Sequence, residues 1–433
     1  MKPTLLRAPG EILVVSCYEL GRQPVAAAAA LAGLERAGFA PGVQDVSVEK
    51  LSDEALRRAR LVAVSVPMHT ALQLGVRVAA RARQANPSAH VAFFGLYAAL
   101  NVQHLLEKHC DSVIGGESVE PLVALAQRLA GEPAPPPTAR RREVLPSRSA
   151  LPLLDRYARL EFSGGTRLVA SVEASRGCKH LCRHCPIVPV YRGRFLAVPR
   201  ETVLADIGQQ ITQGAEHVSF GDPDFLNGPT HALRIARELH ERWPALSFDA
   251  TIKIEHLLQH RALLPELAAC GLLFVTSAVE SLNDGVLRQL DKGHVAGHVP
   301  TAVRILRQAG VELRPTFLPY TPWTALSDLP ALFAFIEEQE LDVDPVQLTL
   351  RLLIPPGSLV LEHAGPWLGP LDPAAFGYRW THEDPRVDAL WKASCDAVRA
   401  GASLEELGAL AGWRGAPRRP RRKAPRLTEP WFC

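Results

Sequence analysis

The sequence lacks several features that would assign it to other classes of protein. No apolar run approaches the roughly 20 residues that a membrane-spanning helix needs. The N-terminal stretch MKPTLLRAPGEILVVSCYELG has neither a signal-peptide core nor a small-residue cleavage site, and its short apolar part is typical of a strand. The formal net charge is only +3, so a broad nucleic-acid-binding surface is not expected. We therefore expect a cytoplasmic protein without membrane or nucleic-acid partners.

The basic residues are distributed unevenly along the chain. The segment from Trp413 to Arg426 holds seven basic residues and no acid, so the +3 total leaves the remainder of the chain at −4. Hydrophobic residues make up 47% and charged residues 21%, which excludes wholesale disorder and predicts sizeable cores. A length of 433 residues predicts two or three domains.

Cysteine is scarce outside one short segment. Three of the eight cysteines fall within the sequence RGCKHLCRHCP, at Cys178, Cys182 and Cys185. A disulfide framework does not have this distribution in a chain of this size, so a reducing compartment with one metal or redox site is expected. We interpret the isolated internal cysteines as small core residues: Cys17, Cys110, Cys270 and Cys395.

Residues 11–130 alternate short apolar strands with helices. Strands are expected at residues 12–16, 61–66, 91–95 and 112–115, and helices at residues 25–37, 72–84, 103–108 and 121–129. This pattern predicts an α/β fold, a Rossmann-like domain whose parallel sheet has helices on both faces. No GxGxxG follows the first strand, so dinucleotide binding is not expected.

The remaining chain divides into four segments. Residues 131–164 begin with a Pro- and Arg-rich stretch that predicts a semi-rigid linker. Residues 165–365 repeat a strand–helix unit six times, which is too few for a closed eightfold barrel and predicts an open, partial (β/α)6 barrel. Residues 366–412 are expected to be a helical extension and residues 413–433 an extended tail. The six barrel strands are expected at residues 168–173, 217–220, 247–251, 273–278, 312–317 and 346–352.

The cysteine-rich segment follows the first expected barrel strand, on a loop that Gly177 opens and Pro186 closes. Three thiolates on one loop can hold a cube of iron and sulfide, for which thiolate is a suitable soft ligand. Three protein ligands leave one iron open for a substrate or cofactor. A structural zinc site is the alternative, with His180 or His184 as the fourth ligand.

This CxxxCxxC loop in a partial barrel resembles the radical S-adenosylmethionine (SAM) superfamily over about residues 165–365. The resemblance implies that Cys178, Cys182 and Cys185 bind a [4Fe–4S] cluster whose open iron chelates SAM. One electron from the reduced cluster then breaks a carbon–sulfur bond of SAM. The resemblance also implies a small-molecule substrate and reduced flavodoxin or ferredoxin as the electron donor.

Two further segments match the superfamily near SAM. Gly221, Asp222 and Pro223, in VSFGDPDF, correspond to the segment that receives the SAM amino group; an ordinary strand-to-helix turn is the alternative. Glu280, in SAVESLNDGVLRQLDKGH, matches the acid that binds the ribose hydroxyls, with a surface helix cap as the alternative. The resemblance continues through Lys292, Gly293 and His294 without implying a role for them.

A third segment, RLLIPPGSLVLE, resembles a proline–glycine turn of the superfamily's cobalamin-type subgroup. The resemblance places Ile354 and Pro355 near the adenine of SAM. Arg351 would bind the SAM carboxylate, because a guanidinium offers two parallel donors, and a structural ion pair is the alternative for this residue. An iron–sulfur binding or sensing protein without turnover would need none of these contacts, and it is the alternative from another functional class.

The domain order resembles cobalamin-binding radical SAM enzymes, and GGESVE at residues 115–120 resembles the end of their Rossmann-like domain. Two features differ. SCYELG at residues 16–21 replaces an Asp-x-His-x-x-Gly loop, and Gly95-Leu96-Tyr97 stands where Gly-Gly is expected. A bulky Leu and Tyr would crowd a backbone that must approach the nucleotide tail of cobalamin. Our favoured expectation is a cap that has lost cobalamin; a cobalamin-type methyltransferase or methylthiotransferase is the alternative.

The chain ends in PRLTEPWFC. With SCYELG, FGLYAALN and RHCPIVPVYRGRF, this ending resembles the CUAEP/CCAEP-tail radical SAM group, named for a terminal Cys-Cys-Ala-Glu-Pro or its selenocysteine form. Because the chain stops at Cys433, we expect a truncated selenoprotein in which a UGA codon was read as a stop. A genuine terminus, with Cys433 as a frayed end, is the alternative.

A thiol/selenol pair on such a tail can hold a thiophilic atom such as trivalent arsenic, so Cys433 is a candidate catalytic residue. A radical SAM enzyme with a cysteine-rich tail forms arsinothricin by transferring the aminocarboxypropyl group of SAM to arsenite. By this resemblance we expect a transferase that alkylates a soft atom such as arsenic on a small substrate.

Overall fold

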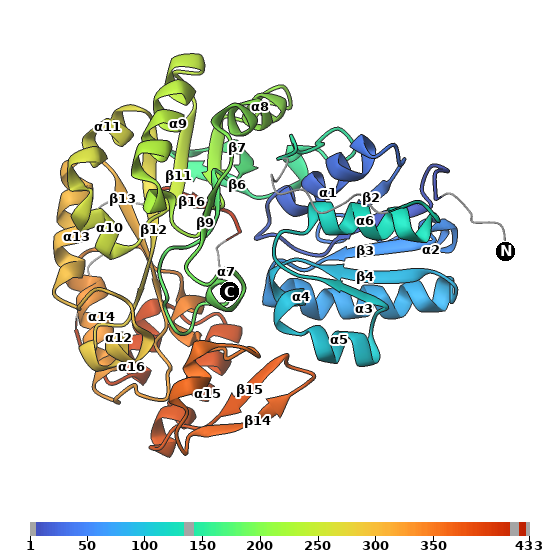
Figure 1. The fold of residues 1–433 in the computed structure, drawn as a ribbon. Helices are drawn as coiled ribbons and strands as arrows, with labels where there is room; N and C mark the ends of the chain where they lie inside the picture. Colours follow the sequence, from blue (N-terminus) through green and yellow to red (C-terminus); the bar gives the residue numbers. More distant parts are fainter. Residues whose placement is uncertain (1–5, 134–142, 416–423, 430–433) are drawn as a thin grey trace.

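The computed structural model describes residues 6–133, 143–415 and 424–429. It contains a five-stranded sheet in the N-terminal part and a seven-stranded sheet in the C-terminal part, which lie side by side (Figure 1). In the described ranges, no helix combines the length and the apolar character needed to cross a bilayer.

The N-terminal sheet is entirely parallel, with strand order β2-β1-β3-β4-β5. One face is covered by α1 (Val25–Arg36) and α6 (Val119–Leu129), and the other by α2 to α5 (Figure 1). The strands are β1 (Ile12–Ser16), β2 (Gly42–Asp45), β3 (Leu61–Ser65), β4 (His90–Phe94) and β5 (Ser112–Ile114); the remaining helices are α2 (Asp53–Arg58), α3 (His69–Ala85), α4 (Leu96–Leu100) and α5 (Val102–Lys108). The predicted Rossmann-like domain is therefore confirmed.

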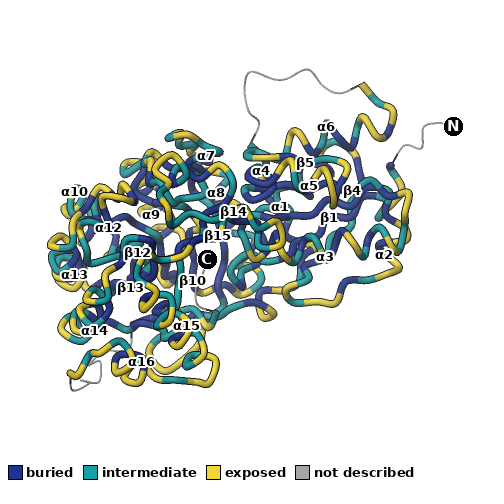
Figure 2. Tube along the Cα trace, turned by 90° about the horizontal axis from the view of Figure 1, so that it is seen from below, coloured by how far each residue is buried: buried dark blue, intermediate teal, exposed yellow. Residues whose placement is uncertain are grey.

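The predicted strand list omitted β2. Its sequence, GVQD, has no apolar run, and it forms the edge of the sheet with most of its residues half-buried. The other strands are apolar because helices cover both of their faces. Tube colouring in Figure 2 shows these strands in dark blue at the centre of the domain.

The second sheet has the order β13-β12-β11-β10-β7-β6-β16 and curls into a half-barrel. Five strands are parallel, and β6 and β16 add antiparallel pairs at one edge. The strands are β6 (Arg159–Phe162), β7 (Gly165–Val172), β10 (His217–Phe220), β11 (Ser247–Thr251), β12 (Leu272–Glu280), β13 (Glu312–Phe317) and β16 (Arg426–Leu427). The outer helices are α8 (Arg200–Ile211), α9 (Pro229–Arg242), α10 (Ile254–Gln259), α11 (Leu264–Ala269), α12 (Asp284–Leu290), α13 (His298–Gln308) and α14 (Asp328–Glu338).

The partial barrel is confirmed, but its expected sixth strand is not formed. Residues 345–349 instead make the 3-10 helix η4 (Pro345–Thr349), and only an isolated bridge joins Tyr320 to Arg351. Proline has no N–H for a strand ladder, and the Asp344 side chain caps the backbone N–H of Val346, so this segment starts a helical turn.

The segment after the barrel also differs from the expected helical extension. It begins with the hairpin β14 (Leu368–Asp372) and β15 (Gly377–Trp380), followed by α15 (Pro385–Arg399) and α16 (Leu404–Leu410). The hairpin loop reaches the N-terminal domain, where Phe376 is buried among the residues under the five-stranded sheet. The carbonyl of Ala375 lies 2.7 Å from Nε2 of His69.

A buried ion pair also joins the two halves of the molecule. Arg148, which precedes the barrel, makes two hydrogen bonds to the carboxylate of Asp206 on α8, at 2.8 and 2.7 Å. Its remaining donors reach the Ser171 carbonyl on β7 and Gln23 before α1. Both charged side chains are almost fully buried, so the contact holds the N-terminal domain against the barrel in one orientation.

Candidate active site

The three cysteines lie on the loop between β8 (Ser175–Gly177) and α7 (Ile187–Tyr191), at the end of the first barrel strand. Strand β8 pairs with β9 (Phe195–Ala197), which closes the base of the loop. Gly177 has φ +73°, and a side chain there would come within 2.3 Å of the Arg194 carbonyl oxygen. Only glycine fits this turn, so the sequence pattern RGC has a structural cause.

The three thiols are free and lie close to one another. Cys178 and Cys182 are buried and Cys185 is half-buried. Burial, together with repulsion from the Cys182 and Cys178 thiols, raises the pKa of Cys185 to about 12. Burial also raises the pKa of Cys178. The thiols of Cys178 and Cys185 are therefore protonated at neutral pH unless a bound metal replaces the protons.

The spacing of the sulfur atoms distinguishes a cluster from a single zinc ion. Two sulfurs bound to one tetrahedral zinc, with bonds of about 2.3 Å, lie roughly 3.8 Å apart. In the described ranges, the three cysteines do not form a set with all ligand atoms within 4.8 Å of one another. Of the two histidines considered as a fourth ligand, His184 contacts Glu280, and His180 lies beside His256 and Asp224. The thiols thus fit an iron–sulfur cube better than the zinc alternative.

Glu280 ends β12 and faces the cysteine loop. Its Oε1 atom lies 3.0 Å from Nε2 of His184 and 3.1 Å from Nζ of Lys292. Burial by itself would raise the pKa of Glu280, but the Lys292 ammonium and His184 outweigh burial and hold that pKa well below its ordinary value. The carboxylate is therefore charged at neutral pH. The sequence resemblance implied no role for Lys292. In the structure its ammonium pairs with the carboxylate of Glu280.

Asp222 lies behind the loop. Its carboxylate accepts hydrogen bonds from the backbone N–H of Ala174 and the hydroxyl of Ser175, and the side chain is buried. Burial raises its pKa to about 7. Asp222 therefore fixes the strand that leads into the cysteines, whereas Gly221 before it is exposed and Pro223 after it is half-buried.

Two other residues of the same segment face the cysteines, and the sequence analysis did not select them. Asn227 Oδ1 accepts a hydrogen bond from the backbone N–H of Lys179 and lies 3.8 Å from Sγ of Cys178. Asp224 is fully buried and lies near His180 and His256. The sequence could have pointed to Asp224, because it is the second acid of DPDF and lies only two residues after Asp222.

Arg351 and Ile354 belong to a separate structural cluster. The Arg351 guanidinium pairs with Asp388 at 2.7 Å, donates to the Trp380 carbonyl oxygen and stacks over the Trp380 ring. Ile354 is fully buried in the same apolar cluster, which also includes Trp380. The structural ion pair considered for Arg351 is therefore the arrangement that forms, with Asp388 and the Trp380 carbonyl oxygen as its partners.

Cys433 lies outside the described residues. The described part of the tail, residues 424–429, returns to the domain boundary: β16 pairs with β6, and Thr428 exchanges hydrogen bonds with Arg159. The hydroxyl of Tyr18, just after β1, donates to Oε1 of Glu429.

The N-terminal domain packs next to the cysteine loop. Glu117 accepts hydrogen bonds from Arg176, which precedes the cysteines, and from the Tyr191 hydroxyl at the end of α7. Residues of α4, the GGE turn, α7 and the Pro356-Gly357 turn enclose a cavity of about 520 Å³. A second cavity of about 660 Å³ is lined by the segments after β1 and β2, by α3, by residues 156–158 and by the tail.

A family model described as the radical SAM superfamily matches residues 172–328. Among curated proteins, the tRNA-2-methylthio-N(6)-dimethylallyladenosine synthase of Shewanella denitrificans is 24% identical over 208 residues, covering 45% of this chain and 43% of that protein. The ribosomal protein uS12 methylthiotransferase RimO of Opitutus terrae is 23% identical over 201 residues, covering 40% and 41%. The chain thus spans less than half the length of these relatives.

Two solved structures share the fold over nearly the whole chain. The radical SAM methyltransferase TsrM from Kitasatospora setae has a TM-score of 0.67 and 16% identity, covering 94% of this chain and 97% of that one. The cobalamin-dependent radical SAM enzyme OxsB has a TM-score of 0.66 and 13% identity, covering 91% and 67%. With the cysteine loop at the end of the first barrel strand, these findings assign residues 172–328 to a radical SAM domain, of the superfamily that uses a [4Fe–4S] cluster and SAM.

Proposed function

We propose that this chain transfers a carbon group of SAM to a small molecule bound between the N-terminal domain and the barrel. The observation that carries the proposal is the position of the N-terminal domain, which packs beside the cysteine loop through Glu117, Arg176 and Tyr191. A substrate in the adjoining 520 Å³ cavity, next to α7, would have both domains as walls.

In this proposal Cys178, Cys182 and Cys185 hold the cluster, which supplies the electron that breaks a carbon–sulfur bond of SAM. The three free thiols on one loop support this assignment. Glu280, kept ionised by Lys292, accepts hydrogen bonds from the ribose hydroxyls of SAM.

Gly221 and Pro223 line the turn beside SAM, and Asp222 holds that turn against Ala174 and Ser175. Ile354 supports the adenine side from within its apolar cluster. A reduced flavodoxin or ferredoxin is the proposed electron donor.

The favoured acceptor is a soft atom such as arsenic on a small substrate, with Cys433 as the residue that binds it. The described part of the tail, residues 424–429, lines the second cavity at the domain boundary, whose lining residues differ from those of the 520 Å³ cavity. Membership of the CUAEP/CCAEP-tail group is part of this proposal and is supported by the sequence resemblance of the tail.

Methyl transfer with cobalamin is the second candidate, favoured by the likeness to TsrM and OxsB over nearly the whole chain. The residues fit cobalamin poorly. The loop directly after β1, residues 17–24, contains no histidine. The histidine after β3, His69, has its Nε2 atom in contact with the Ala375 carbonyl oxygen. Helix α4 begins directly after Gly95 with half-buried Leu96 and buried Tyr97. We therefore derive no step through cobalamin.

The experiment that tests the proposal follows the fate of isotope-labelled SAM. The reconstituted, reduced protein is incubated without oxygen with arsenite, or with arsenite omitted, and with SAM labelled in the methyl or the aminocarboxypropyl group. Mass spectrometry should find the label on arsenic, with methylthioadenosine as the coproduct if the aminocarboxypropyl group moves. Label on a methylated product that requires added cobalamin would favour the second candidate. SAM cleavage with no transferred label in any arm would contradict group transfer.

A further inference from the structure

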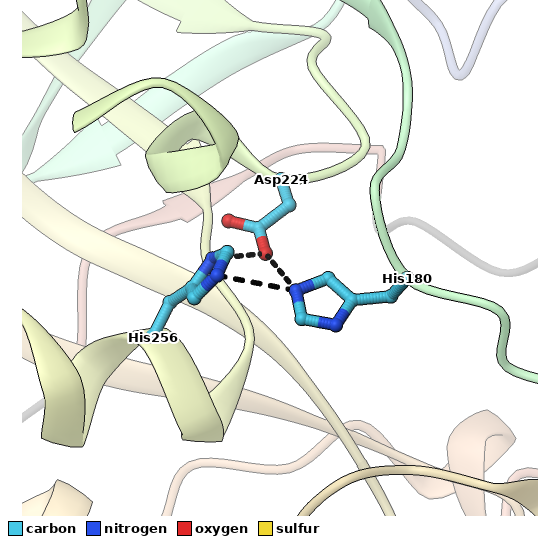
Figure 3. A group of neighbouring side chains, drawn as sticks. All are labelled: His180, Asp224 and His256. Atoms are coloured by element: carbon cyan, nitrogen blue, oxygen red, sulfur yellow. Dashed lines mark hydrogen bonds and ion pairs between the residues drawn. The ribbon is translucent and has the colours of Figure 1, made fainter. Parts of the chain in front are cut away.

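Three side chains next to the cysteine loop are arranged as metal ligands. His180 lies on the cysteine loop, Asp224 precedes the 3-10 helix η2 (Phe225–Asn227), and His256 lies on α10, so each comes from a different element (Figure 3). One ligand atom of each lies within 4.8 Å of the others. We propose that His180, Asp224 and His256 bind one divalent first-row metal ion, distinct from the cluster assigned to the cysteines.

The contact between Asp224 and His256 supports a shared ion. Nδ1 of His256 lies 2.7 Å from Oδ2 of Asp224. Both atoms are buried, yet neither has a hydrogen-bond partner, so the short contact lacks hydrogen-bond geometry. Buried polar atoms are almost always satisfied in proteins. A cation bound by both atoms would satisfy them, with the two atoms moving slightly apart to the spacing of ligands on one ion.

The backbone fixes the orientation of the Asp224 carboxylate. Its other oxygen, Oδ1, accepts a hydrogen bond from the backbone N–H of Leu226 as the cap of η2. That bond leaves Oδ2 to face the two histidines, as Figure 3 shows. A buried carboxylate with one oxygen fixed and the other unpaired is already prepared to bind a cation, because little reorganisation is needed.

His180 completes the set of three ligands. Its Nε2 atom lies 3.9 Å from Oδ2 of Asp224, and the three side chains offer one ligand atom each within 4.8 Å of one another. On the other side of the ring, Oε2 of Glu255 lies 3.6 Å from Nδ1 of His180. A carboxylate beside the non-ligating nitrogen is the usual outer-shell support for a metal-bound histidine.

The ligand types indicate the class of ion. Two imidazoles and one carboxylate suit zinc, manganese, iron(II) or cobalt, whereas calcium and magnesium prefer oxygen ligands alone. Three protein ligands leave a coordination position for water or for a substrate donor. Because His180 lies between Cys178 and Cys182 in the sequence, a substrate held by this ion would lie close to the cysteine loop.

Metal counting on the holoenzyme tests the site. Protein with its cluster in place is dialysed without oxygen against zinc, and zinc, iron and acid-labile sulfide are measured together. We expect one zinc per chain beyond the iron and sulfide of the cluster. Asp224→Asn and His256→Gln should lose the zinc and keep the iron, and Glu255→Gln should weaken zinc binding by about 10–100-fold. His260→Gln, one turn further along and outside the set of three, should retain it.

The wild-type protein supplies a second readout that does not depend on the folding of variants. With manganese(II) in place of zinc and the cluster oxidised, pulsed electron paramagnetic resonance should detect two imidazole nitrogens coupled to one bound manganese. Absence of that coupling, or equal zinc in the wild type and His256→Gln, would overturn the proposal. The proposal would also be overturned if the wild type bound no zinc and Asp224→Asn abolished SAM binding. That result would show that Asp224 binds the amino group of SAM.

Discussion

A single carboxylate oxygen, Oε1 of Glu280, is shared by Nζ of Lys292 at 3.1 Å and Nε2 of His184 at 3.0 Å. The contact joins the end of β12, the segment after α12 and the cysteine loop. Glu280 has φ +63°, in the left-handed region that side chains rarely adopt. These two partners therefore stabilise a backbone conformation that costs about 1–3 kcal/mol on its own.

Replacing Glu280 by glutamine should lower the free energy of unfolding by about 3–5 kcal/mol, because Lys292 stays buried without a charged partner. Denaturant unfolding of the protein without its cluster measures the change. The double variant Glu280→Gln/Lys292→Met should recover most of the loss, since no unpaired charge remains. A double variant no more stable than the single one would show that the ion pair is not what stabilises this region.

Arg351 provides the opposite case, a residue whose loss should affect stability and not SAM. Arg351→Met removes the hydrogen bonds to Asp388 and to the Trp380 carbonyl, so the free energy of unfolding should fall by about 1.5–3 kcal/mol. Arg379→Met is the matched control, because its exposed pair with Asp372 on the same hairpin should contribute little. Equilibrium dialysis should find unchanged SAM binding in both variants. A large loss of SAM affinity in Arg351→Met alone would show instead that Arg351 binds the SAM carboxylate.

Glu19 predicts a pH dependence of stability at the domain boundary. Burial, followed by repulsion from Glu173, raises the pKa of Glu19 to about 8, against about 4.3 in an unfolded chain. Between these values the folded protein holds a proton that the unfolded chain has lost, so Glu19 lowers stability as the pH rises from about 4 to 8. The melting temperature of the wild type should therefore fall relative to that of Glu19→Gln across this range and then level off. A constant difference between the two proteins would contradict the raised pKa.

Docking of the tail depends on close contacts at Gly21 and Tyr18. A side chain at Gly21 would come within 2.2 Å of Oε2 of Glu429, and Tyr18 donates a hydrogen bond to the same carboxylate. Gly21→Ala and Glu429→Ala should therefore release β16 from β6, and trypsin should cleave after Arg426 severalfold faster. Mass spectrometry of a timed digest measures the rate. Glu362→Ala, at an exposed acid, serves as the control, and equal rates in all proteins would show that these contacts do not hold the tail.

Elements with strong local patterns were predictable from the sequence. The strands of the N-terminal sheet other than β2 are mostly apolar, and all were found within a residue or two. The loop that carries the three cysteines was predictable because both the spacing and Gly177 have direct structural causes. Segment 345–352 was not, because its apolar residues suit a strand while Pro345 and the Asp344 cap determine the backbone.

Partners across the site were harder to predict than the elements. Arg351 has the chemistry to bind a carboxylate, but no sequence pattern shows that Asp388 and Trp380 take its donors first. Lys292 lies only 12 residues from Glu280, yet the pairing depends on the turn after α12. Asp224 and His256 are 32 positions apart, and only the adjacent carboxyl ends of β10 and β11 bring them together.

The central claim, that the three cysteines of this loop support reductive cleavage of SAM, is tested most directly by one measurement. Wild-type protein and Cys182→Ser are reconstituted with iron and sulfide without oxygen, reduced, mixed with SAM and analysed for nucleoside products by mass spectrometry. The wild type should form 5′-deoxyadenosine or methylthioadenosine in a reductant-dependent manner, and Cys182→Ser should form neither. Absence of both products from the fully reconstituted wild type, with and without candidate substrates, or equal amounts from Cys182→Ser, would contradict the claim.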